Sequence, residues 1–209
     1  FFDEGEITQW DDLWKPELAN SIMLIDGARE VMGLGLDSLG YSLNSKDDDQ
    51  LQEAFNKLRT MTPNIKAIVA DEIKMYMANE EASVAVTFSG EAADMMYENE
   101  HIHYVIPSEG SNLWFDNMVI PKTSQNEAGA YAFLNFMLEP ENAAQNAEYI
   151  GYSTPNQEAM ALLPDEITED EQFYPSDELM EHLEVYENLG AEYLGIYNDL
   201  FLELKMYRK

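Results

Sequence analysis

The stretch SIMLIDGAREVMGLGLDSLG, residues 21–40, decides the fold class of this chain. Residues 21–25 form a short continuous apolar run, which is typical of a buried strand. Apolar residues then recur at helical spacing over residues 28–39, and Gly40 supplies a helix stop signal. A strand that runs directly into a helix is half of a crossover connection. The stretch therefore predicts an α/β fold with a mainly parallel sheet flanked by helices.

Outward from this stretch, helical and strand patterns alternate along most of the chain. The acidic residues 47–49 precede one helical pattern, as expected at the positive end of a helix dipole, and Pro63 ends it. The predicted further helices cover residues 51–61, 71–79, 89–97, 127–138, 141–150 and 190–206. The predicted strands or extended segments cover residues 83–88, 103–106 and 114–120.

Composition excludes several classes of partner and chemistry. The chain of 209 residues has 41 Asp and Glu against 11 Lys and Arg, which gives a formal net charge of -30. Such a field repels phosphate backbones, so we expect no nucleic-acid partner, and it attracts small cations. Cysteine is absent, which excludes disulfides, thiolate nucleophiles and cysteine zinc sites.

Weaker chemical signals have simpler structural explanations. His101 and His103 would share one face of a strand and could ligate zinc, but no third ligand has recognisable spacing. Residues 47–49 lack the spaced oxygen ligands of a calcium loop. A facing carboxylate pair for glycan cleavage can arise by chance among so many acidic residues, so an enzyme of that class stays open as an alternative.

Residues 114–116, Trp-Phe-Asp, carry a more specific signal. In an extended segment, residues i and i+2 project from the same face, so Trp114 and Asp116 are expected to point together. An indole face attracts a cation and packs its carbon chain, while a carboxylate accepts its N–H bonds. The pair is therefore a candidate site for an ammonium ligand, with a half-buried Trp beside a turn Asp as the alternative.

Several stretches, taken in order, resemble one known family. They are WDDLWKPE at 10–17, DGAREV at 26–31, EGSNLWFDNMVIP at 109–121, LNF at 134–136 and IGYSTPN at 150–156. This ordered set resembles the substrate-binding proteins of polyamine ABC importers, the spermidine/putrescine-binding proteins.

The resemblance implies a periplasmic-binding-protein-like (type II) fold of two lobes. On this basis residues 1–115 belong to the second, C-terminal lobe, residues 116–160 are a return segment of the first lobe, and residues 161–209 complete the second lobe. A signal and most of the first lobe would precede this chain in a longer protein, so we expect it to be truncated at the N-terminus.

The resemblance also implies the function. We expect a protein that binds spermidine or putrescine and delivers it to the permease subunits of an ABC importer, without catalysis, cofactor or metal. It would act in the periplasmic space or at the extracellular face of the cytoplasmic membrane, where a lipid anchor could hold it. The alternative ligand is another small solute bound by the same fold. In this truncated chain we expect the uncovered lobe surface to drive dimerisation or exchange of residues 116–160.

Four site residues are implied in the first and last parts of the chain. Glu30 matches a family carboxylate that binds an amino group, whereas the neighbouring family aspartate falls on Gly27 here, with Asp26 one position earlier. Phe88 stands where the family has Trp, which leaves a weaker ring for a cation. Tyr186 stands at or near a glutamine contact of the family.

Three further site residues are implied in the middle of the chain. Trp114 and Asp116 match the aromatic wall and the main carboxylate of the family, and Tyr152 matches a further aromatic contact.

Overall fold

A computed structural model describes residues 5–207 of the chain, and the ends of the predicted ranges at 1–4 and 208–209 lie outside the described residues. The chain divides into two compact units. The first contains the residues up to Leu113 and those from Asp177 onward, and the second is Trp114–Ser176.

The first unit is built on a three-stranded parallel sheet, as the sequence predicts. Its strands are β1 (Ile22–Ile25), β2 (Ile65–Val69) and β3 (Val84–Val86), in the order β2-β1-β3. Ile22 is opposite Ile65 on one side and Val84 on the other. Because β1 is central, both of its edges are hydrogen-bonded and both of its faces are covered.

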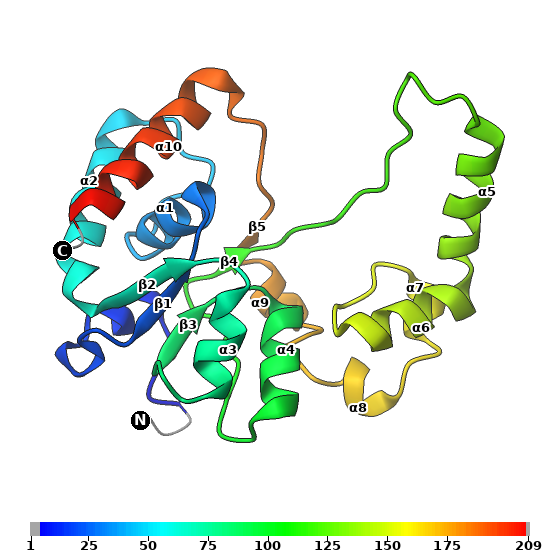
Figure 1. The fold of residues 1–209 in the computed structure, drawn as a ribbon, viewed down its shortest axis with the longest axis horizontal. Helices are drawn as coiled ribbons and strands as arrows, with labels where there is room; N and C mark the ends of the chain where they lie inside the picture. Colours follow the sequence, from blue (N-terminus) through cyan, green and yellow to red (C-terminus); the bar gives the residue numbers. More distant parts are fainter. Residues whose placement is uncertain (1–4, 208–209) are drawn as a thin grey trace. The chain divides into compact units, whose positions relative to one another are not determined.

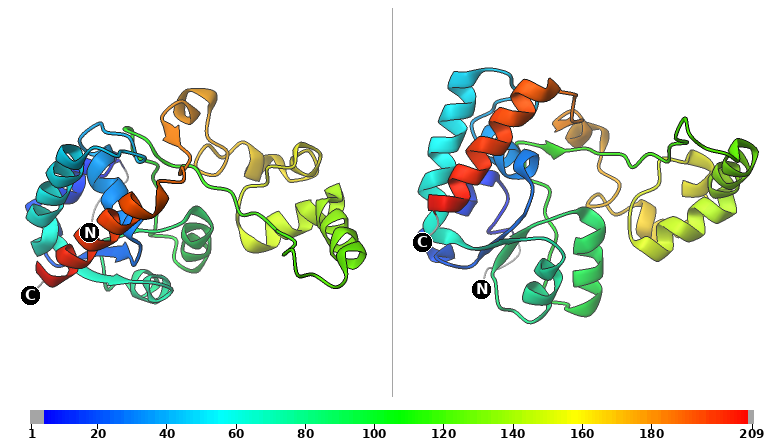
Figure 2. Two further views of the ribbon diagram at one scale, coloured as in Figure 1. Left: turned by 90° about the horizontal axis from the view of Figure 1, so that it is seen from above. Right: turned by 45° about the horizontal axis from the view of Figure 1, so that its top comes forward.

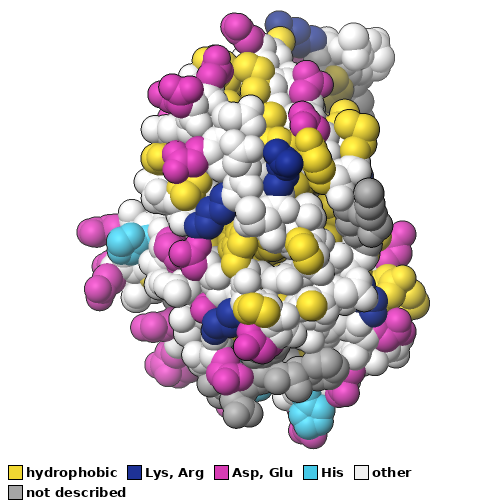
Figure 3. All heavy atoms as spheres, turned by 90° about the vertical axis from the view of Figure 1, so that its left-hand side faces the viewer, with side chains coloured by type: hydrophobic (Ala, Val, Ile, Leu, Met, Phe, Trp, Pro, Cys, Tyr) yellow, Lys and Arg dark blue, Asp and Glu magenta, His cyan; other side chains and the backbone are white. Residues whose placement is uncertain are grey.

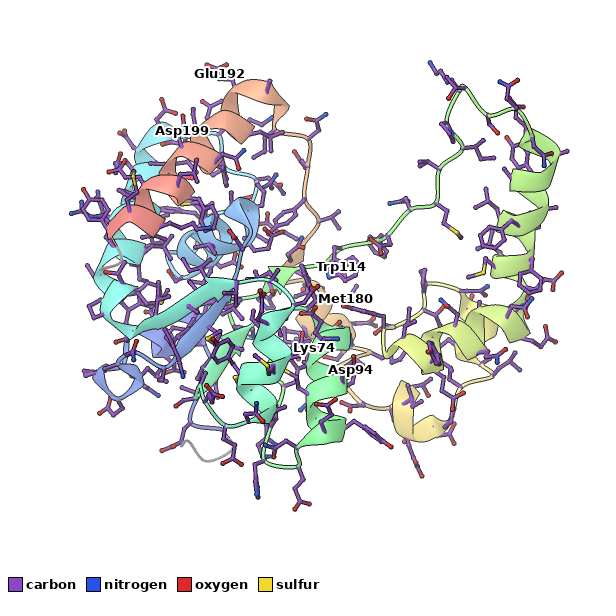
Figure 4. The ribbon with its side chains drawn as sticks, in the orientation of Figure 1. Lys74, Asp94, Trp114, Met180, Glu192 and Asp199 are labelled. Atoms are coloured by element: carbon purple, nitrogen blue, oxygen red, sulfur yellow. The ribbon has the colours of Figure 1, made fainter. Side chains whose placement is uncertain are left out.

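Helices cover the two faces of this sheet as separate layers (Figures 1 and 2). One layer packs with Ile22 and Leu24, and the other packs with Met23, as the two-residue period of a strand requires. The first layer comprises α1 (Ala28–Asp37), α2 (Asp48–Met61) and α10 (Gly190–Tyr207). The second comprises α3 (Glu72–Ala78) and α4 (Ser89–Glu98), joined by an ion pair between Lys74 and Asp94 (Figure 4).

Local sequence signals set the ends of these helices. The Asp47 carboxylate accepts hydrogen bonds from the backbone N–H groups of Asp49 and Gln50, so it caps α2. Gly40 has φ 71°, the left-handed conformation that ends the turn after α1. Three short 3-10 helices complete the first unit: η1 (Trp10–Trp14), η2 (Pro16–Leu18) and η3 (Thr62–Asn64).

A second, two-stranded parallel pair lies where the chain leaves and re-enters the first unit. Its strands are β4 (Ser111–Asn112) and β5 (Leu183–Glu184), and β5 follows the short helix α9 (Asp177–Met180). Gly110, directly before β4, has φ 115°. A Cβ atom at Gly110 would lie 1.9 Å from the carbonyl oxygen of His182, so only glycine fits this close backbone approach.

The second unit is helical and small. Its helices are α5 (Glu127–Leu138), α6 (Pro140–Ile150), α7 (Gln157–Met160) and α8 (Asp165–Thr168). Ala159 and Leu163 pack with Ala144 and Ala147 of α6 in one small core, and Tyr174 packs against it. This core ties residues 161–176 to α6 and α7, and the second unit ends at Ser176. The assignment of each unit to a lobe of a longer protein stays a prediction.

Two differences from the sequence prediction concern the region of the three-stranded sheet. Residues 103–106 form no strand, because Ile102 and Tyr104 pack against the second layer without joining the sheet. Conversely, the sequence prediction left out β2 (Ile65–Val69). Residues 114–120 carry neither helix nor strand.

Acidic side chains are spread over the face that carries α2 and α10, with Lys and Arg side chains among them (Figure 3). Within residues 5–207, no helix is both long enough and apolar enough to cross a bilayer.

Asp37, at the end of α1, lies close to other carboxylates. Burial, together with the negative charges of Glu184 and Glu109, raises the pKa of Asp37 to about 7, although a hydrogen bond from Trp10 acts in the opposite direction. Glu184 belongs to β5 and Glu109 directly precedes Gly110, so these charges surround the β4–β5 pair.

Substituting Asp37 with Asn should stabilise the chain at high pH. A carboxyl group whose pKa is raised from 3.8 to about 7 binds protons more tightly in the folded state, so folding stability falls as pH rises through this window. Asp37→Asn should therefore raise the melting temperature at pH 8 and much less at pH 4, measured by differential scanning calorimetry. Asp199→Asn, an exposed aspartate of α10, is the control for the loss of one charge. Equal shifts for Asp37→Asn at both pH values would contradict this prediction.

Substituting Gly110 with Ala should destabilise the first unit strongly. The new Cβ meets backbone rather than a flexible side chain, and the positive φ adds about 1 kcal/mol of strain. Gly40 also has a positive φ, but a Cβ atom there would have no neighbour within 4 Å. Gly40→Ala therefore measures the backbone strain alone. We expect Gly110→Ala to lower the midpoint of urea unfolding clearly more than Gly40→Ala. Similar midpoints for the two variants would argue against the close approach to His182.

Candidate functional site

The carboxyl ends of β1 and β3 lead directly into the N-termini of α1 and α4. Glu30 lies in the first turn of α1, and Phe88 is the residue before the first turn of α4. Because the two strands are parallel neighbours, both residues lie at the same edge of the sheet. This edge is where open α/β sheets bind ligands.

The Glu30 side chain folds back toward Gly27. A Cβ atom at Gly27 would lie 2.0 Å from Oε2 of Glu30, so the carboxylate occupies space that a side chain at position 27 would need. The carboxylate thus lies at the positive end of the α1 dipole. The negative charge of Glu30 therefore offsets the repulsion that the helix dipole would exert on a cation bound at this edge.

Asp26 already has a cationic partner. Both of its carboxylate oxygens accept hydrogen bonds from Nζ of Lys205, at 2.8 and 2.9 Å. The Asp26 side chain is partly exposed, and Lys205 belongs to α10. An ammonium ligand at Asp26 would therefore compete with Lys205.

Tyr186 lies against the N-terminal part of α1, far along the chain from Glu30. Its ring lies under the guanidinium of Arg29, with 4.2 Å between Cζ and the ring centroid. Burial raises the pKa of the Tyr186 hydroxyl well above its ordinary value, and the negative charge of Glu30 raises it further. The Tyr186 hydroxyl oxygen lies 3.5 Å from the position that a Cβ atom would take at Gly33, one helical turn beyond Glu30. Tyr186 therefore packs against the face of α1 that carries Glu30, and with its raised pKa it is a neutral hydrogen-bonding group.

In the second unit, Trp114 and Tyr152 are in contact. Their ring centroids are 5.4 Å apart and their planes meet at 76°, an edge-to-face pair. Trp114 is the first residue of the unit (Figure 4), and Tyr152 directly follows Gly151, whose φ of 72° turns the chain after α6. Asp116, two residues beyond Trp114, is exposed. The shared orientation of Trp114 and Asp116 stays a prediction.

The structure thus distributes the predicted site residues over both units. Asp26, Glu30, Phe88 and Tyr186 belong to the first unit, and Trp114, Asp116 and Tyr152 belong to the second. Across residues 5–207, no group of three or more His, Asp or Glu is arranged to hold a metal ion. Each set combines carboxylates with aromatic rings, an arrangement that suits an organic cation.

The sequence analysis missed Arg29 as a member of this region. Its one sequence signal is its place directly before Glu30, inside the stretch DGAREV. Periodicity does not reveal it, because its partners lie elsewhere in the chain.

Comparison with known proteins identifies several relatives of this chain. The spermidine/putrescine-binding periplasmic protein of Escherichia coli is 36% identical over 206 residues, covering 99% of this chain and 59% of that protein. The structure of a spermidine/putrescine ABC transporter substrate-binding protein from Streptococcus pneumoniae matches with a TM-score of 0.90 and 63% identity, over 99% of this chain and 64% of that one. A lipoprotein of Treponema pallidum matches with a TM-score of 0.78 and 27% identity, over 94% of this chain and 61% of that one.

The chain therefore spans about 60% of the length of these relatives. The likeness in structure confirms the periplasmic-binding-protein-like α/β fold that the sequence predicts, in a partial chain. The family model described as bacterial extracellular solute-binding protein matches residues 2–175. The chain belongs to this family of solute-binding proteins, which is not a family of enzymes.

Proposed function

We propose that this chain is part of a polyamine-binding protein of an ABC importer, with spermidine or putrescine as the ligand. The observation that carries the proposal is the ring contact between Trp114 and Tyr152. The exposed carboxylate of Asp116 lies two residues beyond Trp114 in the chain. The relatives from Escherichia coli and Streptococcus pneumoniae are named for the same ligands.

The chemistry of a polyamine suits these residues. A polyamine is a flexible apolar rod with positive charges at set intervals, so its binding needs separated carboxylates and aromatic walls. Each cation–π contact contributes about 0.5–2 kcal/mol, depending on how completely the cation is desolvated. Asp116 and Glu30 supply carboxylates, while Trp114, Tyr152 and Phe88 supply rings.

The protein would act outside the cytoplasmic membrane, in the periplasmic space or as a lipoprotein, and would pass its ligand to the permease subunits. The strong negative charge supports this function, since it steers polycations toward the protein at low salt.

The second candidate function keeps the fold and changes the ligand to another small solute. Gly27 and Phe88 favour it, because both depart from the family pattern.

Titration of the full-length protein with spermidine and putrescine by calorimetry tests the proposal. Asp116→Asn should weaken binding about tenfold or more, because removing the carboxylate partner of a desolvated ammonium costs about 2–5 kcal/mol. Asp165→Asn removes the same charge from an exposed position of the second unit and is the matched control.

Unchanged affinity in Asp116→Asn would remove Asp116 from the site.

A thermal-shift panel separates the two candidate ligands, because a solute that binds only the folded state raises the melting temperature of the protein. If neither polyamine shifts the transition and another solute does, the second candidate replaces the first.

The 209-residue chain by itself should bind polyamine weakly and self-associate. Helix α5 buries none of its side chains within the described chain, and its aromatic residues Tyr131, Phe133 and Phe136 are more than half exposed. Apolar patches of this kind favour association. Sedimentation equilibrium should detect dimers at micromolar concentration. A monomer with nanomolar affinity for spermidine would contradict this expectation.

A further inference from the structure

Arg29 holds together three parts of the first unit that are distant in sequence. It lies in the first turn of α1, and its Nη1 and Nη2 atoms donate to the backbone oxygens of Glu187 and Leu43, at 3.3 and 3.1 Å. Nη2 also donates to Oδ1 of Asn44, at 2.9 Å. The planar fork of the guanidinium thus connects α1 to the loop at residues 42–46 and to the segment after β5.

Asn44 completes this connection. Its Oδ1 accepts a hydrogen bond from the backbone N–H of Glu187 at 2.8 Å, and its Nδ2 donates to the backbone oxygen of Val185 at 3.0 Å. The backbone on both sides of Tyr186 is therefore held by Arg29 and Asn44. The position of Tyr186 depends on this pair.

The flat face of Arg29 determines how the Tyr186 ring is presented. The guanidinium carbon lies 4.2 Å from the centroid of the Tyr186 ring and 5.2 Å from that of Tyr197. One face of the Tyr186 ring is thus already occupied by a cation. A ligand ammonium can reach Tyr186 only through the other face, the edge or the hydroxyl group.

A contribution to stability alone is a poor explanation for Arg29. Its Nε atom is buried and has no hydrogen-bond partner among the described residues. An unpaired buried donor is costly, and an apolar side chain of similar volume would avoid this cost. Arg29 is better suited to positioning a polar group than to filling the core.

We propose that Arg29 is the positioning residue of the ligand site: its guanidinium fork and flat face hold Tyr186 beside Glu30, so that one aromatic hydroxyl and one carboxylate face the ligand together. This role rests on the proposed function. It predicts that the first unit recognises a single ammonium group at this end, through Glu30 and Tyr186, because the guanidinium excludes a second cation from the covered ring face.

The chain contains a matched control. Arg59 of α2 lies over the ring of Tyr207 of α10 with the same 4.2 Å between Cζ and the ring centroid, and neither residue is among the proposed ligand residues. Arg29→Gln and Arg59→Gln therefore remove the same charge and the same kind of ring contact. Only the first should affect ligand binding.

The test is a double-mutant cycle measured by calorimetry with spermidine and putrescine on the full-length protein. Arg29→Gln and Tyr186→Ala should each weaken binding about fivefold or more, and the double variant should be no weaker than Tyr186→Ala alone. Arg29→Lys, which keeps the charge and loses the planar fork, should behave like Arg29→Gln and serves if the latter fails to fold. Hydrogen exchange should rise at residues 184–187 in both Arg29 variants and stay unchanged in Arg59→Gln.

The outcomes separate this role from the proposed function. If the wild-type protein binds neither polyamine, the proposed function and the role of Arg29 fall together. If it binds and the Arg29 variants bind equally well, only the role of Arg29 is overturned. The same conclusion follows if the loss from Arg29→Gln persists in full in the Tyr186→Ala background, because Arg29 would then not act through Tyr186.

Discussion

The parallel pairing of β1 with both β2 and β3 is the constraint on which the first unit depends. Parallel strands must be joined by connections that cross over the sheet. The helices that follow the strands therefore all begin at the same edge, where the strands end. Glu30 and Phe88 come to one edge for this reason alone, although they are distant in sequence. The crossover helices then bury β1 on both faces.

The ligand site therefore depends on backbone topology first and on side chains second. The helix N-termini at the sheet edge carry partial positive charge, which opposes the binding of a cation. The carboxylate of Glu30, folded over Gly27, offsets this charge at α1. Gly27 thus contributes by lacking a side chain, since any Cβ atom there would displace the carboxylate.

Local signals made part of this architecture predictable, and long-range contacts explain the rest. Asp47 could be predicted as a helix cap because its partners lie two and three residues away. Strand β2 was missed because Lys66 interrupts its apolar run, and only pairing with β1 makes it a strand. Arg29 was missed for the same reason, as its hydrogen bond to Glu187 spans 158 positions. Most of the proposed ligand residues were predicted from stretches that resemble the family of polyamine-binding proteins. The two-residue period of an extended segment alone predicts only Trp114 and Asp116.

Basic side chains lie at the sheet edge, although the chain as a whole is strongly acidic. The net charge is -30, yet two of the 11 basic residues, Arg29 and Lys205, lie beside Glu30 and Asp26. The long-range field attracts cations without distinguishing among them, and salt weakens it. Discrimination among cations must then come from short-range contacts, where Lys205 competes for Asp26 and Arg29 covers one face of Tyr186. An acidic surface and a selective site are thus separate properties of this chain, supplied by different residues.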